Sequence, residues 1–503
     1  MEKEKASRLR ITLDRLEEGT GELGGSLRVD NKLPEGVHNK ELFKDVVKIA
    51  WPSFIELILT QLASMVDLMM VGSIGGKAHP EYGTQALTAV GITNQPKFLL
   101  MTAFIAMNVG VTALVARHKG MGNREEANKV VRQGLLFTFC VTIILSAVGI
   151  IFSRPLVILM GSTEEIVTEW ATQYLQIQLA GFLTMALTST ITASLRGVGD
   201  SRSSMFYNLI ANLVNVFLNW VLIYGKLGAP AMGVAGASIA TVLGQLVAFI
   251  IALSIILRGN GFLKLEFKLG FRLDKKTMSD LMNIGIPSMI EQLLMRIGMI
   301  VFSVTVASLG TVAFATHQVC MNIQALSFMT GQAFAVSSTT LVGQSLGKKR
   351  PDMAQAYASR CQRLGIGVGL LLTVLFAVFG GDIVGLYNSQ EEVVKMGADI
   401  MFFVAFVQPF QASQFILAGG LRGAGDTKAT AVIITITTMF LRPTLALILV
   451  HMGFGIFGAW VALATDQLLR SLLIFIRYRS GKWKMIKLKS ESEKSESVKA
   501  VTA

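Results

Sequence analysis

The residues best suited to ion chemistry are one carboxylate and a series of amides that lie within apolar stretches of the chain. Asp67 stands near the end of the first such stretch. Asn208, Asn212, Asn215 and Asn219 are spaced by four and three residues, which places their amides on one face of a helix. Carboxylate and carbonyl oxygens bind hard cations such as Na⁺, and a carboxylate also binds a proton. Because a charge inside a membrane is costly, Asp67 is predicted to be functional. The alternatives are a capping role for Asp67 and interhelical hydrogen bonding for the amides.

Two glutamates occupy matching places in the sequence. Glu56 follows Pro52 by four residues, and Glu291 follows Pro287 by four residues. A proline inside a helix leaves a backbone carbonyl without its usual partner. The shared placement favours an architectural role, in which the glutamates bond to backbone groups that the prolines leave free.

Two arginines, Arg296 and Arg442, also lie inside apolar stretches. A lone cation in lipid is costly, so Glu291 is the expected counter-ion for one of them. His317 is expected to be a satisfied buried histidine, because no Cys/His/Asp cluster accompanies it. The remaining polar candidates, which would line a substrate cavity or serve the structure, are Gln61, Gln318 and Gln411.

The chain contains two copies of one unit. The octet LRGVGDSR at 195–202 recurs as LRGAGDTK at 421–428. Further matches in the same order relate 52–56 to 287–291, 112–115 to 339–342 and 233–237 to 455–459. Asp67 has no acidic counterpart, since the second copy holds Phe302 at the same distance from the Pro-Ser pair. Carriers are often built from two related halves, so the repeat favours a transporter.

The apolar stretches themselves predict an all-α membrane protein. The 503 residues are 52% hydrophobic and 16% charged, with a mean hydropathy of +0.55. A helix needs about 20 apolar residues to cross a bilayer. The sequence offers twelve such segments, at 49–71, 86–116, 130–152, 170–195, 205–224, 236–257, 281–306, 312–341, 364–386, 400–421, 429–450 and 456–476.

The distribution of charge predicts the topology. Lys and Arg collect on alternate loops, for example at 117–132, 258–276, 348–363 and 477–489, and this pattern places both termini in the cytoplasm. The net charge of +13 is therefore a topology signal, and no nucleic-acid partner is expected. The expected organisation is a cytoplasmic N-terminal segment (1–44), an N-lobe of six helices (45–260), a cytoplasmic inter-lobe loop (261–279), a C-lobe of six helices (280–479) and a disordered cytoplasmic tail (480–503).

Several function classes find no support in the sequence. The Gly-x-Gly-Asp of each octet lacks the Walker spacing and the Lys-Ser/Thr ending, so both octets are interpreted as turns between helices. No Ser/His/Asp or Cys/His arrangement is placed for catalysis, and an enzyme is not expected. Cys140, Cys320 and Cys361 predict neither a structural disulfide nor a metal site.

Taken together, the motifs resemble the multidrug and toxic compound extrusion (MATE) family, in its bacterial NorM-like form. The motifs that carry the resemblance are DLMMVG at 67–72, both LRGxGD turns, GVAGASIAT at 233–241, HQ at 317–318 and LVGQ at 341–344. The resemblance implies two six-helix lobes around a central cavity that opens alternately to each side of the plasma membrane. It also implies export of organic cations and amphipathic drugs by a monomer without a cofactor, driven by Na⁺ or H⁺.

The resemblance also implies roles for particular residues. Asp67 matches the family's ion-coupling acid, Asn215 and Asn219 match polar positions of the same site, and Thr241 matches a nearby hydroxyl. The C-lobe departs from the pattern, because Met295 and Gln411 stand where relatives carry acids. Coupling is therefore expected in the N-lobe, with transient Na⁺ binding as one option. The main alternative is a lipid-linked oligosaccharide flippase, which Arg296 and Arg442 would serve by binding pyrophosphate.

Overall fold

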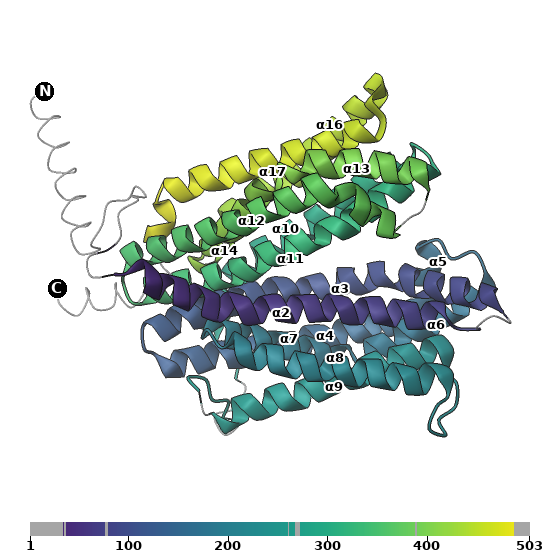
Figure 1. Ribbon diagram of the computed structural model, residues 1–503. Helices are drawn as coiled ribbons and strands as arrows, with labels where there is room; N and C mark the ends of the chain where they lie inside the picture. Colours follow the sequence, from purple (N-terminus) through teal and green to yellow (C-terminus); the bar gives the residue numbers. More distant parts are fainter. Residues whose placement is uncertain are drawn as a thin grey trace, which may run out of the picture.

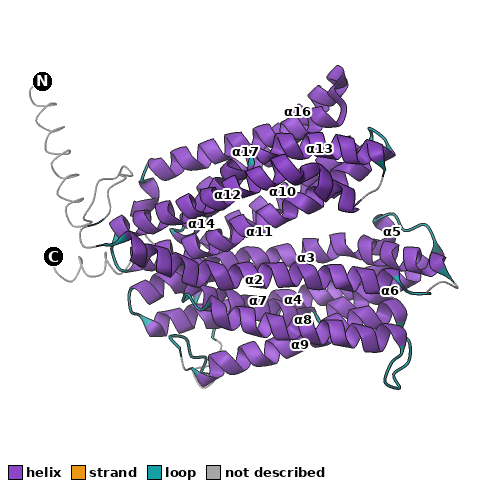
Figure 2. Ribbon diagram, in the orientation of Figure 1, coloured by secondary structure: helices purple, strands orange, loops and turns teal. Residues whose placement is uncertain are grey.

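The computed structural model describes residues 34, 37–75, 79–259, 261–266, 272–387 and 390–486. The expected N-terminal segment before residue 34 and the tail beyond residue 486 lie outside the described residues. Within these ranges all regular structure is helical, which confirms the expected fold class (Figure 2).

The helices of the first copy are α2 (Asn39–Gly72), α3 (Pro80–Gly120), α4 (Arg124–Ile151), α5 (Ser153–Leu159), α6 (Glu165–Ala180), α7 (Phe182–Gly197), α8 (Ser201–Tyr224) and α9 (Gly233–Arg258). Those of the second copy are α10 (Lys275–Ala307), α11 (Thr311–Gly347), α12 (Pro351–Tyr387), α13 (Glu391–Ala405), α14 (Gln408–Gly423), α15 (Thr427–Thr435), η2 (Ile436–Leu441), α16 (Arg442–Leu449), η3 (Val450–Phe454), α17 (Gly455–Arg479) and η4 (Lys482–Met485).

The described helices account for the twelve predicted spans. Nine helical stretches are long and apolar enough to cross a membrane, and two bent helix pairs raise the number to eleven. One of the nine, Thr427–Arg479, has 53 residues. At 1.5 Å per residue it would be about 80 Å long, more than twice the thickness of a bilayer core. The chain turns back at Gly453, where φ is +88°, so this stretch forms two spans.

Two of the predicted spans are broken helices rather than continuous ones. The segment predicted at 170–195 bends by 49° at Gly181, between α6 and α7. A Cβ atom at Gly181 would lie 2.4 Å from Val242, so glycine permits the close approach of α9 at the bend. The segment predicted at 400–421 bends by 54° between α13 and α14. Here Pro409 cannot continue the backbone hydrogen bonding of the preceding helix.

Helices α2–α9 and α10–α17 form two lobes that diverge away from the end at which α2 begins and α17 ends (Figure 1). The octet turns and the first residues of α2 lie at this end, which we call the basic end. The lobes meet there closely. Thr340 and Gln344 of α11 donate to the carbonyls of Arg196 and Gly197 at 2.8 and 2.9 Å. The first copy's Gly120 approaches the backbone of Gln344 so closely that an added Cβ would lie 2.0 Å from its carbonyl oxygen.

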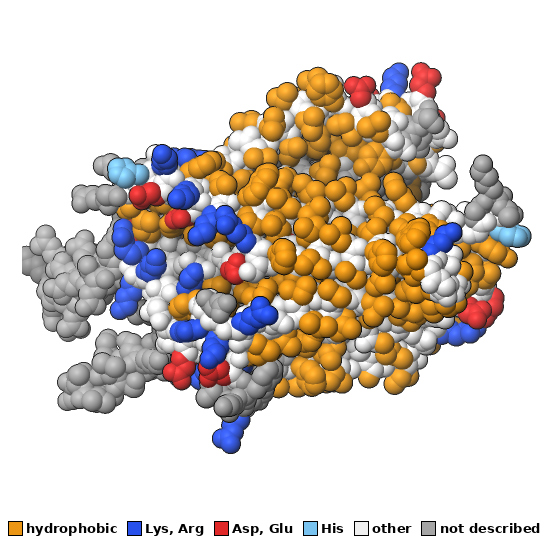
Figure 3. All heavy atoms as spheres, turned by 60° about the horizontal axis from the view of Figure 1, so that its bottom comes forward, with side chains coloured by type: hydrophobic (Ala, Val, Ile, Leu, Met, Phe, Trp, Pro, Cys, Tyr) orange, Lys and Arg blue, Asp and Glu red, His pale blue; other side chains and the backbone are white. Residues whose placement is uncertain are grey.

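The surface of the molecule has an apolar middle and a basic end. Hydrophobic side chains cover the middle of the molecule, and Lys and Arg side chains gather at the basic end (Figure 3). Large apolar side chains such as Leu371, Val378 and Ile151 are 68%, 64% and 73% exposed. Such exposure suits lipid rather than water as the surrounding solvent.

The connection between the lobes is anchored at the start of α10. Asp274 accepts hydrogen bonds from the backbone N–H and hydroxyl of Thr277, and its carboxylate lies 3.0 Å from the Lys129 ammonium. Partial burial alone would raise the pKa of Asp274, but these hydrogen bonds and the lysine lower it to about 2. The carboxylate is therefore charged at neutral pH and caps α10.

The predicted topology can be tested by labelling. In a chain without Cys140, Cys320 and Cys361, we expect an impermeant maleimide to label His79→Cys in intact cells and to miss Lys482→Cys. Both positions are exposed and lie at opposite ends of the molecule. Permeabilised cells provide the control, since both cysteines should then react. Labelling of Lys482→Cys alone in intact cells would contradict the predicted orientation.

Candidate functional site

The interface between α2 and α8 brings Asp67 together with Asn215 and Asn219, the grouping that the family resemblance implies. The half-buried Asp67 carboxylate accepts a hydrogen bond from the amide of fully buried Asn219. About three turns nearer the start of α8, Asn208 donates to Glu56 in the same interface. Both bonds join residues 152 positions apart. Two helices of equal rise keep one register along their contact, which is why the polar face of α8 meets both acids of α2.

Asn215 and Thr241 complete the cluster around Asp67. In the orientation that satisfies both ends of its amide, Asn215 donates to Asp67 at 2.8 Å and accepts from the Thr241 hydroxyl at 3.3 Å. The carbonyl oxygen of Asn219 is buried and has no hydrogen-bond partner within the described ranges. A carboxylate beside an unpartnered carbonyl oxygen and a hydroxyl is a set of oxygen donors that suits a hard cation. Groups of three or more His, Cys, Asp or Glu side chains that could hold a metal ion are absent from the described residues.

A lysine that the sequence analysis overlooked lies beside this cluster. Lys97 of α3 donates to the side-chain carbonyl of Gln178 at 3.1 Å and interacts electrostatically with Asp67. Tyr174, one turn from Gln178 on α6, also interacts electrostatically with Asp67. Lys97 lies within the predicted second span, and a lysine inside a membrane segment is itself a signal of function. Apart from its sequence position, no pattern in the chain indicates that it would lie near Asp67.

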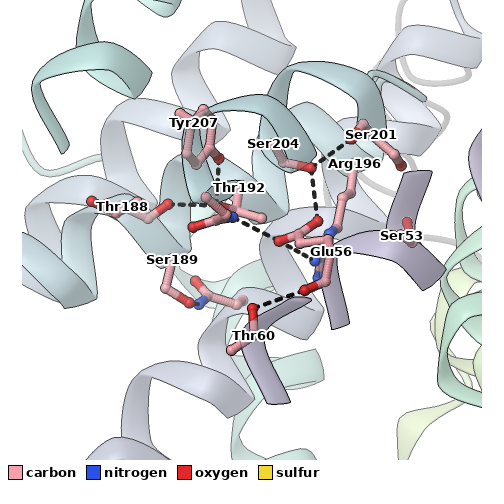
Figure 4. A network of polar contacts seen from close by, with 12 residues as sticks. Ser53, Glu56, Thr60, Thr188, Ser189, Thr192, Arg196, Ser201, Ser204 and Tyr207 are labelled. Carbon is pink, nitrogen blue, oxygen red and sulfur yellow. Dashed lines mark hydrogen bonds and ion pairs between the residues drawn. The ribbon is translucent and has the colours of Figure 1, made fainter. Parts of the chain in front are cut away.

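Glu56 belongs to a separate polar network between the middle of α2 and the start of α8 (Figure 4). Its carboxylate lies 2.9 Å from the guanidinium of Arg196 and accepts from Asn208 at 2.7 Å and Ser204 at 3.2 Å. The expected architectural role is thus consistent with these contacts, but the partners differ from the expected backbone groups. The hydroxyl of Ser53, rather than Glu56, bonds the backbone, and it donates to the Ile49 carbonyl at 3.0 Å.

The second copy contains an equivalent ion pair, and the partner predicted for Glu291 is wrong. Glu291 pairs with Arg422 of the second octet, not with Arg296 or Arg442. Arg296 is five residues further along α10, which places it about 140° around the helix from Glu291. Each octet arginine therefore binds the glutamate that follows the proline in its own copy.

The octet glycines allow these turns to form. Gly199 and Gly425, which occupy equivalent positions, have φ of +80° and +89°. L side chains rarely adopt this conformation. Asp200 caps α8 by accepting from the backbone N–H of Ser203 at 3.2 Å, and Asp426 lies 2.7 Å from the guanidinium of Arg477. These contacts confirm the interpretation of the octets as turns that bond neighbouring helix ends.

Arg442 has a buried counter-ion that the sequence analysis missed. The Asp466 carboxylate, fully buried in α17, accepts from the Arg442 guanidinium at 2.8 Å and also binds Arg470. Arg470 donates further to the hydroxyl of Thr437 at 3.2 Å. An acid and an arginine four residues apart inside the twelfth apolar segment were the available signal. Two buried arginines share one buried carboxylate in this cluster.

The other predicted polar residues do not join either acid of α2. Arg296 stacks on the Phe98 ring at 4.8 Å, across the boundary between the lobes. His317 is buried between the rings of Phe302 and Trp460, as expected, but its Nδ1 has no partner among the described residues, so it is not fully satisfied. Gln411 bonds Gln324 and Ser327 in the C-lobe, Gln318 is exposed, and Gln61 is half-buried on α2.

Comparison with known proteins gives one family match in each of the two copies. The MatE family model matches residues 52–221 and 287–448. The chain is 27% identical to the uncharacterized transporter YisQ of Bacillus subtilis over 86% of this chain and 94% of that protein. It is 27% identical to a probable multidrug resistance protein NorM of Thermotoga maritima over 88% of this chain and 93% of that protein. An outward-facing multidrug resistance MATE family transporter of the MOP superfamily superimposes with a TM-score of 0.81 at 19% identity, covering 91% of this chain and all of that one.

Proposed function

The chain belongs to the MatE family, and on this premise we propose that it is a secondary transporter that exports organic cations and amphipathic compounds in exchange for Na⁺ or H⁺. The observation that carries the proposal is the cluster of Asp67, Asn215, Asn219 and Thr241 between α2, α8 and α9. Relatives named as multidrug resistance proteins support drugs as the substrate class.

Asp67 is the proposed ion-coupling residue. A carboxylate at membrane depth is costly while it is charged and unpaired. Binding of a proton, or of Na⁺ with the oxygens of Asn219 and Thr241 as further ligands, removes that cost. The cluster thus has two charge states whose relative stability depends on the ion concentration at the side to which it is open.

Helix α2 offers a route from this site to the boundary between the lobes. At its basic end, the Val46 carbonyl accepts from Ser337 at 3.3 Å and Asp45 accepts from Tyr357 at 2.7 Å, both in the C-lobe. Asp67 lies on the same helix. A change in the position of α2 upon ion binding would therefore alter the contacts that hold the lobes together. If the ion and the exported compound favour different lobe arrangements, the ion gradient drives export.

The flippase alternative loses one of the two arginines, Arg296 and Arg442, that would serve it. Pyrophosphate would require unpaired cationic groups in the cavity, whereas Arg442 is buried against Asp466. We further propose that the protein works as a monomer in the plasma membrane, with both termini in the cytoplasm and without a cofactor. The basic end and the lipid-facing apolar surface support this placement.

The transport proposal predicts ion-dependent accumulation of a quaternary ammonium dye. Because such a dye carries a permanent charge, a pH gradient cannot trap it by protonation. Proteoliposomes loaded with Na⁺ or with acid are diluted into medium without that gradient ion, with the membrane potential clamped. We expect uptake with one of the two gradients and none in protein-free vesicles. Accumulation that requires ATP, or that proceeds without either gradient, would refute the proposal.

A further inference from the structure

The ammonium group of Lys97 is held in a polar setting that leaves it available to Asp67. Its described hydrogen bond goes to the neutral amide of Gln178, at 3.1 Å. The amide N–H₂ of Gln178, itself only 5% exposed, donates to the Ser238 carbonyl of α9 at 3.4 Å. Ser238 precedes Thr241 by one turn, so the lysine is anchored to the same helix that completes the Asp67 cluster.

Lys97 is also placed to approach Asp67 directly. Side chains of a helix lean towards its N-terminus, and α3 runs from the end opposite the basic end. The lysine side chain therefore extends towards the depth at which Asp67 lies on α2. Among the described groups, Lys97 and Asp67 interact electrostatically with each other, and Tyr174 on α6 interacts with Asp67. Arg296 of α10 stacks on Phe98, which is the residue next to Lys97 in the sequence.

We propose that the Lys97 ammonium is an internal cation that exchanges with the coupling ion, resting on Gln178 while the ion occupies Asp67 and moving to Asp67 when the ion leaves. This inference rests on the proposed role of Asp67 in ion coupling. It makes Lys97 a residue that sets the affinity for the coupling ion, in addition to the oxygen ligands of the cluster.

The physical reason is the cost of the ion-free state. Without a bound ion, Asp67 is a carboxylate at membrane depth whose described partners are neutral amides. A tethered ammonium nearby stabilises that carboxylate by Coulomb attraction, which is strong in a medium of low dielectric constant. Stabilising the ion-free state lowers the affinity for the ion and so allows the ion to be released.

The second copy lacks both members of the pair. Phe302 takes the place of Asp67, and Gln324 takes the place of Lys97, at the offset of 227 residues that relates Thr112 to Thr339. Gln324 bonds Gln411 in the C-lobe rather than an acid. The acid and the lysine thus occur together in one lobe and are absent together from the equivalent positions of the other.

The test uses the full-length protein in proteoliposomes and compares Lys97→Gln, the residue found in the second copy, with Lys97→Arg. Dye export is measured as a function of Na⁺ concentration at fixed pH and as a function of pH without Na⁺. Removal of the competing charge should lower the Na⁺ concentration for half-maximal export roughly tenfold, or raise the midpoint of the pH dependence by about one unit. The maximal rate should fall, because the ion is released less readily. Lys97→Arg keeps the charge and should restore the wild-type dependence on Na⁺ or pH, whatever its maximal rate.

A second variant predicts a shift of opposite sign. Gln178→Met removes the resting acceptor of the ammonium while keeping a side chain of similar length. Lys97 should then reside longer at Asp67, which raises the Na⁺ requirement or lowers the pH midpoint. A merely structural role for both residues would shift the two variants in the same direction. If Lys97→Gln fails to reach the membrane, the direction of the Gln178→Met shift decides the question.

The outcome for Lys97 is distinguishable from the outcome for the transport proposal. Unchanged ion dependence in Lys97→Gln and Gln178→Met, with ion dependence lost in Asp67→Asn, overturns the exchange of the lysine with the ion but leaves the coupling role of Asp67 intact. Retained ion dependence in Asp67→Asn overturns the proposed coupling role itself, and the exchange inference with it.

Discussion

Replacement of Asp67 by asparagine is expected to reduce gradient-driven export to the level of protein-free vesicles. Asparagine keeps the size of the side chain and an oxygen that can accept from Asn219, but it cannot change charge when a proton or Na⁺ binds. The amide costs less at membrane depth than a carboxylate, so folding and membrane insertion should survive. Export is measured with the quaternary ammonium dye, and binding of the dye by its fluorescence in detergent.

The matched control for Asp67→Asn is Asp382→Asn, which removes an exposed carboxylate from α12. This variant should export at the wild-type rate. Substrate binding is expected to persist in both variants, since the loss in Asp67→Asn concerns coupling. Wild-type export by well-inserted Asp67→Asn would shift the search for the coupling acid to Glu56 and Glu291.

The second large effect concerns stability. Asp466→Asn should lower the free energy of unfolding by about 3–5 kcal/mol, because a buried charge left without its partner is strongly destabilising. In this variant Arg442 and Arg470 would both be buried without a carboxylate. The measurement is the thermal unfolding midpoint in detergent, together with the amount of protein in the membrane. Asp399→Asn, at an exposed position of α13, is the control and should have the same thermal unfolding midpoint as the wild type.

A double variant separates charge from packing at this cluster. Adding Arg470→Gln to Asp466→Asn returns the net charge of the three residues to that of the wild type. We expect part of the lost unfolding midpoint to be recovered. A double variant that melts below Asp466→Asn would show that packing, rather than uncompensated charge, dominates the stability of the cluster.

The sequence was sufficient for features that depend on position along the chain. The repeat, the number of spans and the polar face of α8 follow from spacing alone. Asp67 meets Asn219 because α2 and α8 keep a single register, and one face of a helix is readable from the spacing of its residues.

Features that depend on rotation and tilt of helices were not predictable in the same way. The partner of Glu291 was assigned wrongly, since the choice between Arg296, Arg442 and Arg422 depends on which face of α10 meets the second octet turn. The bends at Gly181 and Pro409 depend on close approach of a neighbouring helix and on one missing N–H. Lys97 and Asp466 were visible in the sequence, but their significance comes from the contacts they make.

The most direct test of ion coupling at Asp67 is the movement of the ion itself. Exchange is reciprocal, so an imposed gradient of substrate must drive the ion in the opposite direction. Proteoliposomes are prepared without any ion gradient, the substrate is added to one side, and Na⁺ and H⁺ fluxes are recorded. The account predicts substrate-driven flux of one of these ions with the wild-type protein and no flux with Asp67→Asn. Equal ion flux with both proteins, or substrate movement without any ion flux in the wild type, would contradict it.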